Sequence, residues 1–214
     1  MKLILITCEN FFEGETEAVN QLFETGLQIL HLRKPNAKEI SIREFMEKID
    51  PSYHKRIVLA DCYAIEKRFE IKGIHINRRN IKDEVDLLDF LMTKERGNLT
   101  ISCSCHSIEE LEYSKWCDYV FLSPLFDSIS KPGYQKRFTE AELKIAGEKN
   151  IINEKIIGLG GITAENIPLV HGYGFGGVAV SGALWGNYPE RGNINEVLER
   201  FKGIERAVNK YGYI

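Results

Sequence analysis

The sequence lacks the features that mark membrane proteins, nucleic-acid-binding proteins and secreted disulfide-rich domains. None of its apolar runs approaches the roughly 20 residues that a membrane-spanning helix requires. The net charge is −3, from 28 basic and 31 acidic residues, so there is neither a basic field for nucleic acid nor an acidic tail. The apolar run at the N-terminus is too short for the core of a signal peptide, and we therefore expect a cytoplasmic protein.

Paired cysteines and a dinucleotide-binding turn are missing as well. The five cysteines are odd in number and include no C-x-x-C pair, so neither a disulfide framework nor a zinc site is indicated. We expect them to behave as small buried hydrophobic residues. No G-x-G-x-x-G follows the first apolar run, which argues against a Rossmann-type sheet. No linker or low-complexity segment divides the chain.

Apolar, β-branched runs alternate with helical patterns along the whole chain. The runs predicted to be strands are Leu3–Thr7, Leu27–Leu32, Ile57–Ala60, Gly73–Ile76, Leu99–Ser104, Tyr119–Leu122, Ile156–Leu159 and Gly177–Val180. The segments predicted to be helices are Thr16–Glu24, Ala37–Lys48, Cys62–Phe69, Asp83–Thr93, Ile108–Lys115, Glu140–Glu148, Ala164–Val170 and Ile194–Tyr211. Repeats of about 27 residues are typical of an α/β barrel, so we predict a single (β/α)8 TIM-barrel domain over residues 1–214.

Two glycine-containing turns follow the seventh and eighth predicted strands. Gly160 and Gly161 end the first of these strands, and Ser181 and Gly182 end the second. Thr163 stands where the N-cap of the next helix is expected. Such turns either only pack helix on sheet or direct backbone N–H groups at one anion, and in TIM barrels this position is the usual phosphate site. We favour the phosphate site.

Polar side chains also follow the second and third predicted strands. His31 and Arg33 are two residues apart and therefore share one face of their strand. The guanidinium of Arg33 suits bidentate contact with a phosphate, and a surface ion pair is the alternative. Asp61 could ligate Mg²⁺ or cap the helix that follows.

The fifth predicted strand separates polar from apolar residues. Ser102, Ser104 and His106 share the face expected to point into the barrel, whereas Cys103 and Cys105 share the outer face. His106 could be an acid or base near neutral pH, or a structural histidine.

A long loop, residues 123–134, follows the sixth predicted strand. Loops of this length in compact barrels are usually functional. This loop supplies hydroxyls at Ser128 and Ser130 and a positive charge at Lys131. It is either a lid over an anionic substrate or a solvated surface loop.

Five short motifs are spread over nearly the whole chain. They are S-C-H-S (Ser104–Ser107), D-Y-V (Asp118–Val120), P-L-F-x-S-x-S-K (Pro124–Lys131), L-G-G-I-T-A-E-N-I (Leu159–Ile167) and G-V-A-V-S-G (Gly177–Gly182). Taken together, this set resembles thiamine phosphate synthase and its TenI-type thiazole tautomerase relatives. The resemblance implies a TIM barrel that joins hydroxymethylpyrimidine diphosphate to hydroxyethylthiazole phosphate, with Mg²⁺ as cofactor and diphosphate as the leaving group.

The resemblance also implies roles for single residues. Basic and hydroxyl residues match the diphosphate site, and the two glycine turns match the thiazole-phosphate site. The predicted catalytic residues are Arg33, Ser104, His106 and Lys131. The predicted substrate-binding residues are His31, Arg78, Ser128, Ser130, Gly160, Gly161, Ser181 and Gly182, and the predicted metal ligands are Asp61 and Asn80.

The chain departs from the family pattern only on the diphosphate side. In the family's Q-x-R-x-K, His31 replaces the glutamine and Pro35 the lysine. Ala60 replaces the asparagine that precedes the first metal carboxylate. Arg78 and Asn80 stand where the family has Q-x-D, so the second metal carboxylate is lost. This loss should weaken Mg²⁺ binding, because Mg²⁺ is held mostly by charged oxygens.

Three functions remain open from the sequence. We favour the coupling transferase over a TenI-like isomerase, in which His106 would move protons without a metal, and over a non-catalytic binder of thiazole or thiamine phosphates. The expected partners are small phosphorylated substrates, without nucleic acid or membrane. Whether the chain forms a homo-oligomer is left open.

Overall fold

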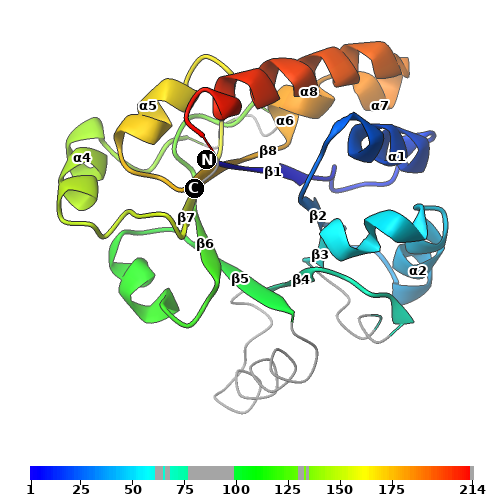
Figure 1. Ribbon diagram of the computed structural model, residues 1–214, viewed down its shortest axis with the longest axis horizontal. Helices are drawn as coiled ribbons and strands as arrows, with labels where there is room; N and C mark the ends of the chain where they lie inside the picture. Colours follow the sequence, from blue (N-terminus) through cyan, green and yellow to red (C-terminus); the bar gives the residue numbers. More distant parts are fainter. Residues whose placement is uncertain (61–64, 66–67, 77–98, 130–132, 134, 213–214) are drawn as a thin grey trace.

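The computed structural model describes residues 1–214 except 61–64, 66–67, 77–98, 130–132, 134 and 213–214. In the described part, eight parallel strands pair in sequence order and close into one barrel (Figure 1). The strands are β1 (Lys2–Ile6), β2 (Leu30–Leu32), β3 (Ile57–Leu59), β4 (Gly73–Ile76), β5 (Thr100–Cys105), β6 (Tyr119–Leu122), β7 (Ile156–Leu159) and β8 (Gly177–Val180). β1 pairs with both β2 and β8, which closes the ring. The predicted (β/α)8 barrel is confirmed.

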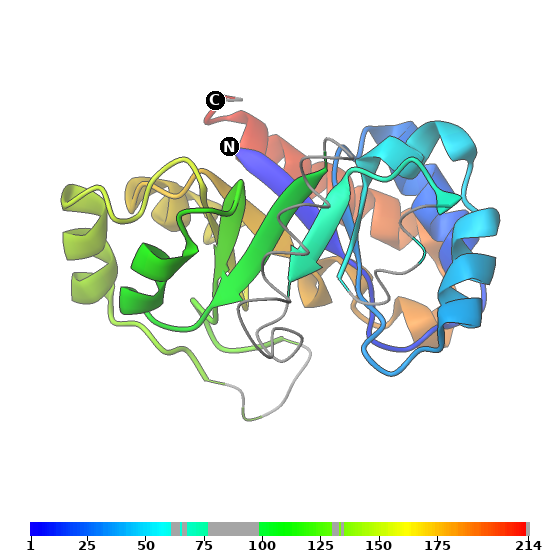
Figure 2. The same cartoon turned by 90° about the horizontal axis from the view of Figure 1, so that it is seen from below.

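Helices surround the barrel on its outside (Figures 1 and 2). They are α1 (Glu15–Thr25), α2 (Glu39–Glu47), η1 (Pro51–Arg56), η4 (Glu109–Ser114), α4 (Glu140–Glu148), α5 (Ile167–Gly172), α6 (Gly182–Trp185), α7 (Tyr188–Arg191) and α8 (Ile194–Asn209). The N-terminal amine of Met1 donates a hydrogen bond to the Gly212 carbonyl. Both ends of the chain therefore meet at the same end of the barrel (Figure 2).

The predicted bounds of β4, β6, β7, β8 and α4 agree with the structure. β2 begins three residues later than predicted, because Gly26 caps α1 and Leu27 N donates to Leu22 O at 3.0 Å. The helix predicted at Asp83–Thr93 lies outside the described residues, as does most of the one predicted at Cys62–Phe69.

Two predicted helix features are wrong in detail, and two helices of the described residues were not predicted. The segment predicted as an α-helix at Ile108–Lys115 forms the 3-10 helix η4, in which Leu111 N donates to Ile108 O at 3.2 Å. Thr163 is not the N-cap of α5, because that helix begins later, after Asn166. The helices η1 and α7 were missed.

Side chains of the strands divide between the barrel interior and the layer under the helices. The interior is filled by Ile4, Ile6, Tyr119, Phe121, Ile157 and Ala179. Cys103 and Cys105 belong to the outer layer, where Cys103 Sγ lies 3.2 Å from Cys117 Sγ. Ser102 points inward to a histidine of β4 and is fully buried. The predicted alternation along the fifth strand is confirmed.

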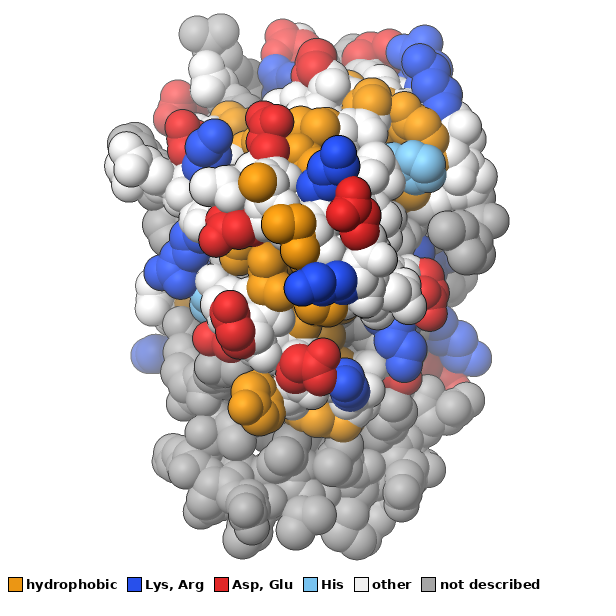
Figure 3. Space-filling view, turned by 90° about the vertical axis from the view of Figure 1, so that its left-hand side faces the viewer, with side chains coloured by type: hydrophobic (Ala, Val, Ile, Leu, Met, Phe, Trp, Pro, Cys, Tyr) orange, Lys and Arg blue, Asp and Glu red, His pale blue; other side chains and the backbone are white. Residues whose placement is uncertain are grey.

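The outer face that carries α4 and α5 mixes apolar side chains with acidic and basic ones (Figure 3). Ile145 of α4 and Leu169 of α5 are among the exposed large apolar residues, at 51% and 41% exposure. Among the described residues, no helix combines the length and apolar character that crossing a bilayer would need.

Candidate functional site

A cavity of about 640 Å³ opens where the strands of the barrel end. Its wall is built from the segments that follow β1, β2, β5, β6, β7 and β8, as expected for a TIM barrel. The predicted site residues that line it are Arg33, Ser104, His106, Ser128, Gly160, Gly161, Ser181 and Gly182. Most of the described candidates, which were chosen because they lie at or just after the ends of predicted strands, therefore meet at one cavity.

The turn after β7 needs glycine at two successive positions. Gly160 and Gly161 have φ angles of 98° and 62°, a region that residues with a side chain rarely adopt. A Cβ on Gly160 would lie 2.7 Å from the Cβ of Pro124, and one on Gly161 would collide with the carbonyl oxygen of Asp127. The turn thus packs tightly against the loop after β6. Any larger residue here disrupts this packing, whatever it does to a ligand.

Asn166 holds the glycine turn in shape. Its side-chain Nδ2 donates to the Gly161 carbonyl at 2.9 Å, and its Oδ1 accepts from Thr163 N at 3.0 Å. No role was predicted for Asn166 from the sequence. The sequence feature that could have indicated a role for Asn166 is its place inside the motif Leu159–Ile167.

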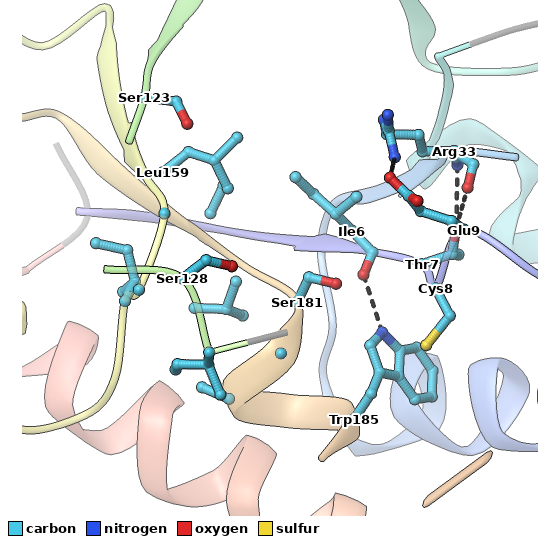
Figure 4. A pocket seen from close by; sticks show the side chains of 18 of the residues that line it. Ile6, Thr7, Cys8, Glu9, Arg33, Ser123, Ser128, Leu159, Ser181 and Trp185 are labelled. Atoms are coloured by element: carbon cyan, nitrogen blue, oxygen red, sulfur yellow. Dashed lines mark hydrogen bonds and ion pairs between the residues drawn. The ribbon is translucent and has the colours of Figure 1, made fainter. Parts of the chain in front are cut away.

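The turn after β8 is fixed by Trp185. Its indole Nε1 donates to the Ile6 carbonyl at 2.9 Å, and the side chain is 1% exposed. The ring of Phe12 meets the indole edge-on at 5.7 Å. The tryptophan therefore ties α6, which begins directly after Ser181, to the end of β1 (Figure 4).

Arg33 is held at the opposite side of the cavity, across from Ser128 (Figure 4). Its backbone N donates to Thr7 Oγ1 at 2.9 Å, and that hydroxyl donates to the Arg33 carbonyl at 3.1 Å. The guanidinium Nη1 donates to Glu9 Oε1 at 2.5 Å, in an ion pair whose side chains are 29% and 41% exposed. The predicted positive charge therefore faces the cavity, with a carboxylate that was not predicted beside it.

The neighbouring Lys34 points away from the cavity. Its Nζ lies 2.7 Å from both carboxylate oxygens of Glu15 and donates to the Asn10 carbonyl at 3.0 Å. Both side chains of the pair are at most 2% exposed. Burial raises the pKa of Glu15 to about 7, although Lys34 pulls it down, and burial lowers the pKa of Lys34. This pair anchors the segment that carries Glu9.

His106 is exposed and lines the cavity. Its Nδ1 lies 2.9 Å from the Ser123 carbonyl, which can only accept, so Nδ1 carries the proton of the neutral ring. The Nε2 atom of the neutral ring is then a proton acceptor. This arrangement suits a general base.

His31 does not reach the cavity wall. It is 1% exposed, and its Nε2 lies 2.6 Å from the hydroxyl of Tyr119 inside the barrel. Burial holds its pKa well below the usual histidine value. The alternation of the strand predicted the correct face of His31 but not its depth, and the predicted direct contact with substrate is not supported.

The remaining predicted residues are Asp61, Arg78, Asn80, Ser130 and Lys131, all of which lie outside the described residues. Among the residues that are described, no group of three or more His, Cys, Asp or Glu side chains could hold a metal ion. The predicted Mg²⁺ site therefore stays a prediction.

Residues 3–184 match the thiamine monophosphate synthase family (TMP-TENI). A thiamine phosphate pyrophosphorylase structure from Bacteroides thetaiotaomicron is 35% identical, with a TM-score of 0.82 and 98% of each chain covered. Another, from Pyrococcus furiosus, is 21% identical, has a TM-score of 0.74 and covers 98% of this chain and 96% of that one. The thiamine-phosphate synthase of Ruminiclostridium cellulolyticum is 27% identical over 210 residues, 93% of this chain and 94% of the relative. The chain therefore belongs to the thiamine monophosphate synthase family.

Proposed function

We propose that this protein is a thiamine phosphate synthase, which joins hydroxymethylpyrimidine diphosphate to hydroxyethylthiazole phosphate and releases diphosphate. The observation that supports this most is that Arg33 and the two glycine turns line one cavity in a chain of this family. A positive charge and two phosphate-type turns in one cavity suit two phosphorylated substrates. The cytoplasmic location expected from the sequence stays a prediction.

The reaction requires the protein mainly to position the two substrates and to neutralise the negative charge of the leaving group. The bond between the pyrimidinylmethyl carbon and the diphosphate oxygen breaks, and its electron pair leaves with the diphosphate. The thiazole nitrogen then donates its lone pair to the resulting carbocation. Arg33 neutralises charge that develops on the leaving group, because its guanidinium is a fixed double donor in a partly enclosed site. The turns at Gly161 and Ser181 hold the thiazole phosphate, which aligns the two reacting atoms.

A direct test follows release of inorganic diphosphate. Release is expected only when both substrates are present, since the carbocation needs the thiazole nitrogen as its acceptor. Release from the pyrimidine substrate alone, at the same rate, would show a simple hydrolase instead.

A weak Mg²⁺ site is expected. Mg²⁺ prefers oxygen ligands, but the two predicted metal ligands are one carboxylate, Asp61, and one neutral amide, Asn80. We predict that Asn80→Asp lowers the Mg²⁺ concentration for half-maximal coupling by roughly tenfold. Asn209→Asp at the exposed end of α8 is the matched control and should leave the titration unchanged. An unchanged Mg²⁺ titration in Asn80→Asp would place the metal elsewhere.

Glu9 competes with an anionic substrate for Arg33. Oε1 of Glu9 lies 2.5 Å from Nη1 of Arg33, so a diphosphate must displace the carboxylate or bind beside its negative charge. We predict that Glu9→Gln tightens binding of inorganic diphosphate by about three- to tenfold in calorimetry, as expected for a partly exposed ion pair. Glu13→Gln, an exposed residue of the same segment, should have no effect. Equal or weaker affinity in Glu9→Gln would show that the carboxylate does not compete.

The orientation of His106 supports a TenI-like thiazole tautomerase as a second candidate. Its Nε2 is an acceptor in the cavity, and proton transfer needs no metal. If this candidate is correct, the protein turns over a thiazole carboxylate phosphate tautomer, and His106→Asn stops that turnover.

A further inference from the structure

A line of polar side chains runs through the barrel interior and ends at the cavity. It begins at His31, whose Nε2 lies 2.6 Å from the hydroxyl of Tyr119, and Tyr119 is the register partner of Ser102 across the β5–β6 pair. Ser102 Oγ lies 2.9 Å from Nδ1 of His75, and Nε2 of His75 lies 3.0 Å from Ser104 Oγ. Only Ser104 lines the cavity, and the other four residues are at most 4% exposed. We call these five residues the interior line.

Both histidines of the interior line are neutral. The ring of Phe121 lies 4.8 Å from that of His31 and 4.9 Å from that of His75, so the surroundings are apolar. Burial, followed by the charge of Arg33, lowers the pKa of His75 to about 3, and burial lowers that of His31. A neutral imidazole has one N–H donor and one acceptor nitrogen, and a hydroxyl both donates and accepts. Every member of the interior line can therefore donate in either direction.

The direction of the hydrogen bonds decides what Ser104 presents to the cavity. In one direction, Ser104 O–H donates inward to His75 Nε2, and only its oxygen lone pairs face the cavity. In the other, His75 Nε2–H donates to Ser104, whose O–H turns toward the cavity. An anion is repelled by the first arrangement and accepts a hydrogen bond from the second. Arg33, whose charge reaches His75, attracts anions to this end of the line.

We propose that His75 is a positioning residue that changes tautomer when a phosphate-type anion binds beside Ser104, so that the whole interior line turns its donors toward the cavity. Each histidine loses the proton on one ring nitrogen and gains one on the other through exchange with water. The hydroxyls of Ser102, Ser104 and Tyr119 rotate to match, and the number of bound protons does not change. The proposal rests on the proposed function only in taking a diphosphate-type anion as the ligand at Arg33.

The test is nitrogen-15 NMR of the histidine rings, with inorganic diphosphate as the probe. Two-bond proton–nitrogen correlations identify which ring nitrogen carries the proton. We expect His75 and His31 to change from Nδ1–H to Nε2–H as diphosphate saturates the protein. His54 is the internal control, because its Nε2 faces the carbonyls of Met46 and Ile49, which accept only and keep the proton there.

Two variants separate this positioning role from a merely structural one. In Tyr119→Phe the line is cut, so His75 should still change tautomer while His31 no longer responds. In Ser104→Ala neither histidine should respond, and diphosphate should bind about tenfold more weakly, through loss of a hydrogen bond to a charged group. Unchanged tautomers at saturating diphosphate would overturn the proposal, as would absence of diphosphate binding. A tautomer change in a protein that does not couple the substrates would leave the proposal standing and reject the proposed function.

Discussion

Arg33→Ala is expected to lower kcat/KM for coupling by roughly a hundred- to a thousandfold, the range found when one fixed donor to a developing negative charge is removed. The backbone N–H and carbonyl of Arg33 both hydrogen-bond the hydroxyl of Thr7, and this fixes the position from which the guanidinium enters the cavity. The loss of kcat/KM should be seen for the pyrimidine substrate, because its diphosphate is the leaving group. Thiazole-phosphate binding should be spared, because the turns at Gly161 and Ser181 line another part of the wall.

Two further variants test whether the lower rate is due to the guanidinium of Arg33. Arg33→Lys keeps the charge but loses the planar double donor, so it should recover only part of the rate. Arg206→Ala removes an exposed arginine of α8 that does not line the cavity, and it should not change the rate. A coupling rate in Arg33→Ala equal to that of the unaltered protein would show that the diphosphate binds elsewhere.

Lys34→Met is expected to destabilise the protein by about 3–5 kcal/mol, measured by urea unfolding, because it leaves the buried Glu15 without its cation. Lys34 is fully buried, and its Nζ binds the carboxylate and the Asn10 carbonyl together. Lys202→Met is the matched control, since its ion pair with Glu199 is exposed, and it should cost less than about 1 kcal/mol. The double variant with Glu15→Leu should recover much of the loss, because no unpaired charge remains.

The loss in Lys34→Met should also depend on pH. Lys34 lowers the pKa of Glu15, so its removal raises the folded-state pKa above the present value of about 7. Between the ordinary value of 4.5 and that folded-state pKa, the unfolded chain has released the proton that the folded chain still holds. The free energy of unfolding therefore falls as pH rises through this window. Relative to the double variant, Lys34→Met should be less stable at pH 8 than at pH 5.5. A pH-independent loss would contradict the assigned burial of Glu15.

The site could be predicted well from the rule that functional residues of a TIM barrel follow the ends of its strands, because this rule needs only local sequence patterns. Apolar runs end where the barrel strands end, and the residues that follow must meet at one mouth. Gly161, Ser181 and Arg33 were placed in the cavity wall by this rule alone.

What the sequence could not show depends on contacts between distant segments. Trp185 donates a hydrogen bond to a carbonyl 179 residues away, and Glu9 accepts one from the guanidinium of Arg33, which directly follows β2. Neither contact leaves a local pattern. His31 shows a related limit, because alternation gives the face of a strand but not the height of a side chain along the barrel axis.

The most direct measurement is mass-spectrometric detection of thiamine phosphate after the protein is incubated with hydroxymethylpyrimidine diphosphate and hydroxyethylthiazole phosphate, with and without Mg²⁺. Turnover of a thiazole carboxylate phosphate tautomer is followed in parallel. The proposed function predicts thiamine phosphate and diphosphate in equal amounts, with a rate that rises with Mg²⁺ up to high concentration. Absence of thiamine phosphate at saturating Mg²⁺, together with turnover of the tautomer, would contradict it.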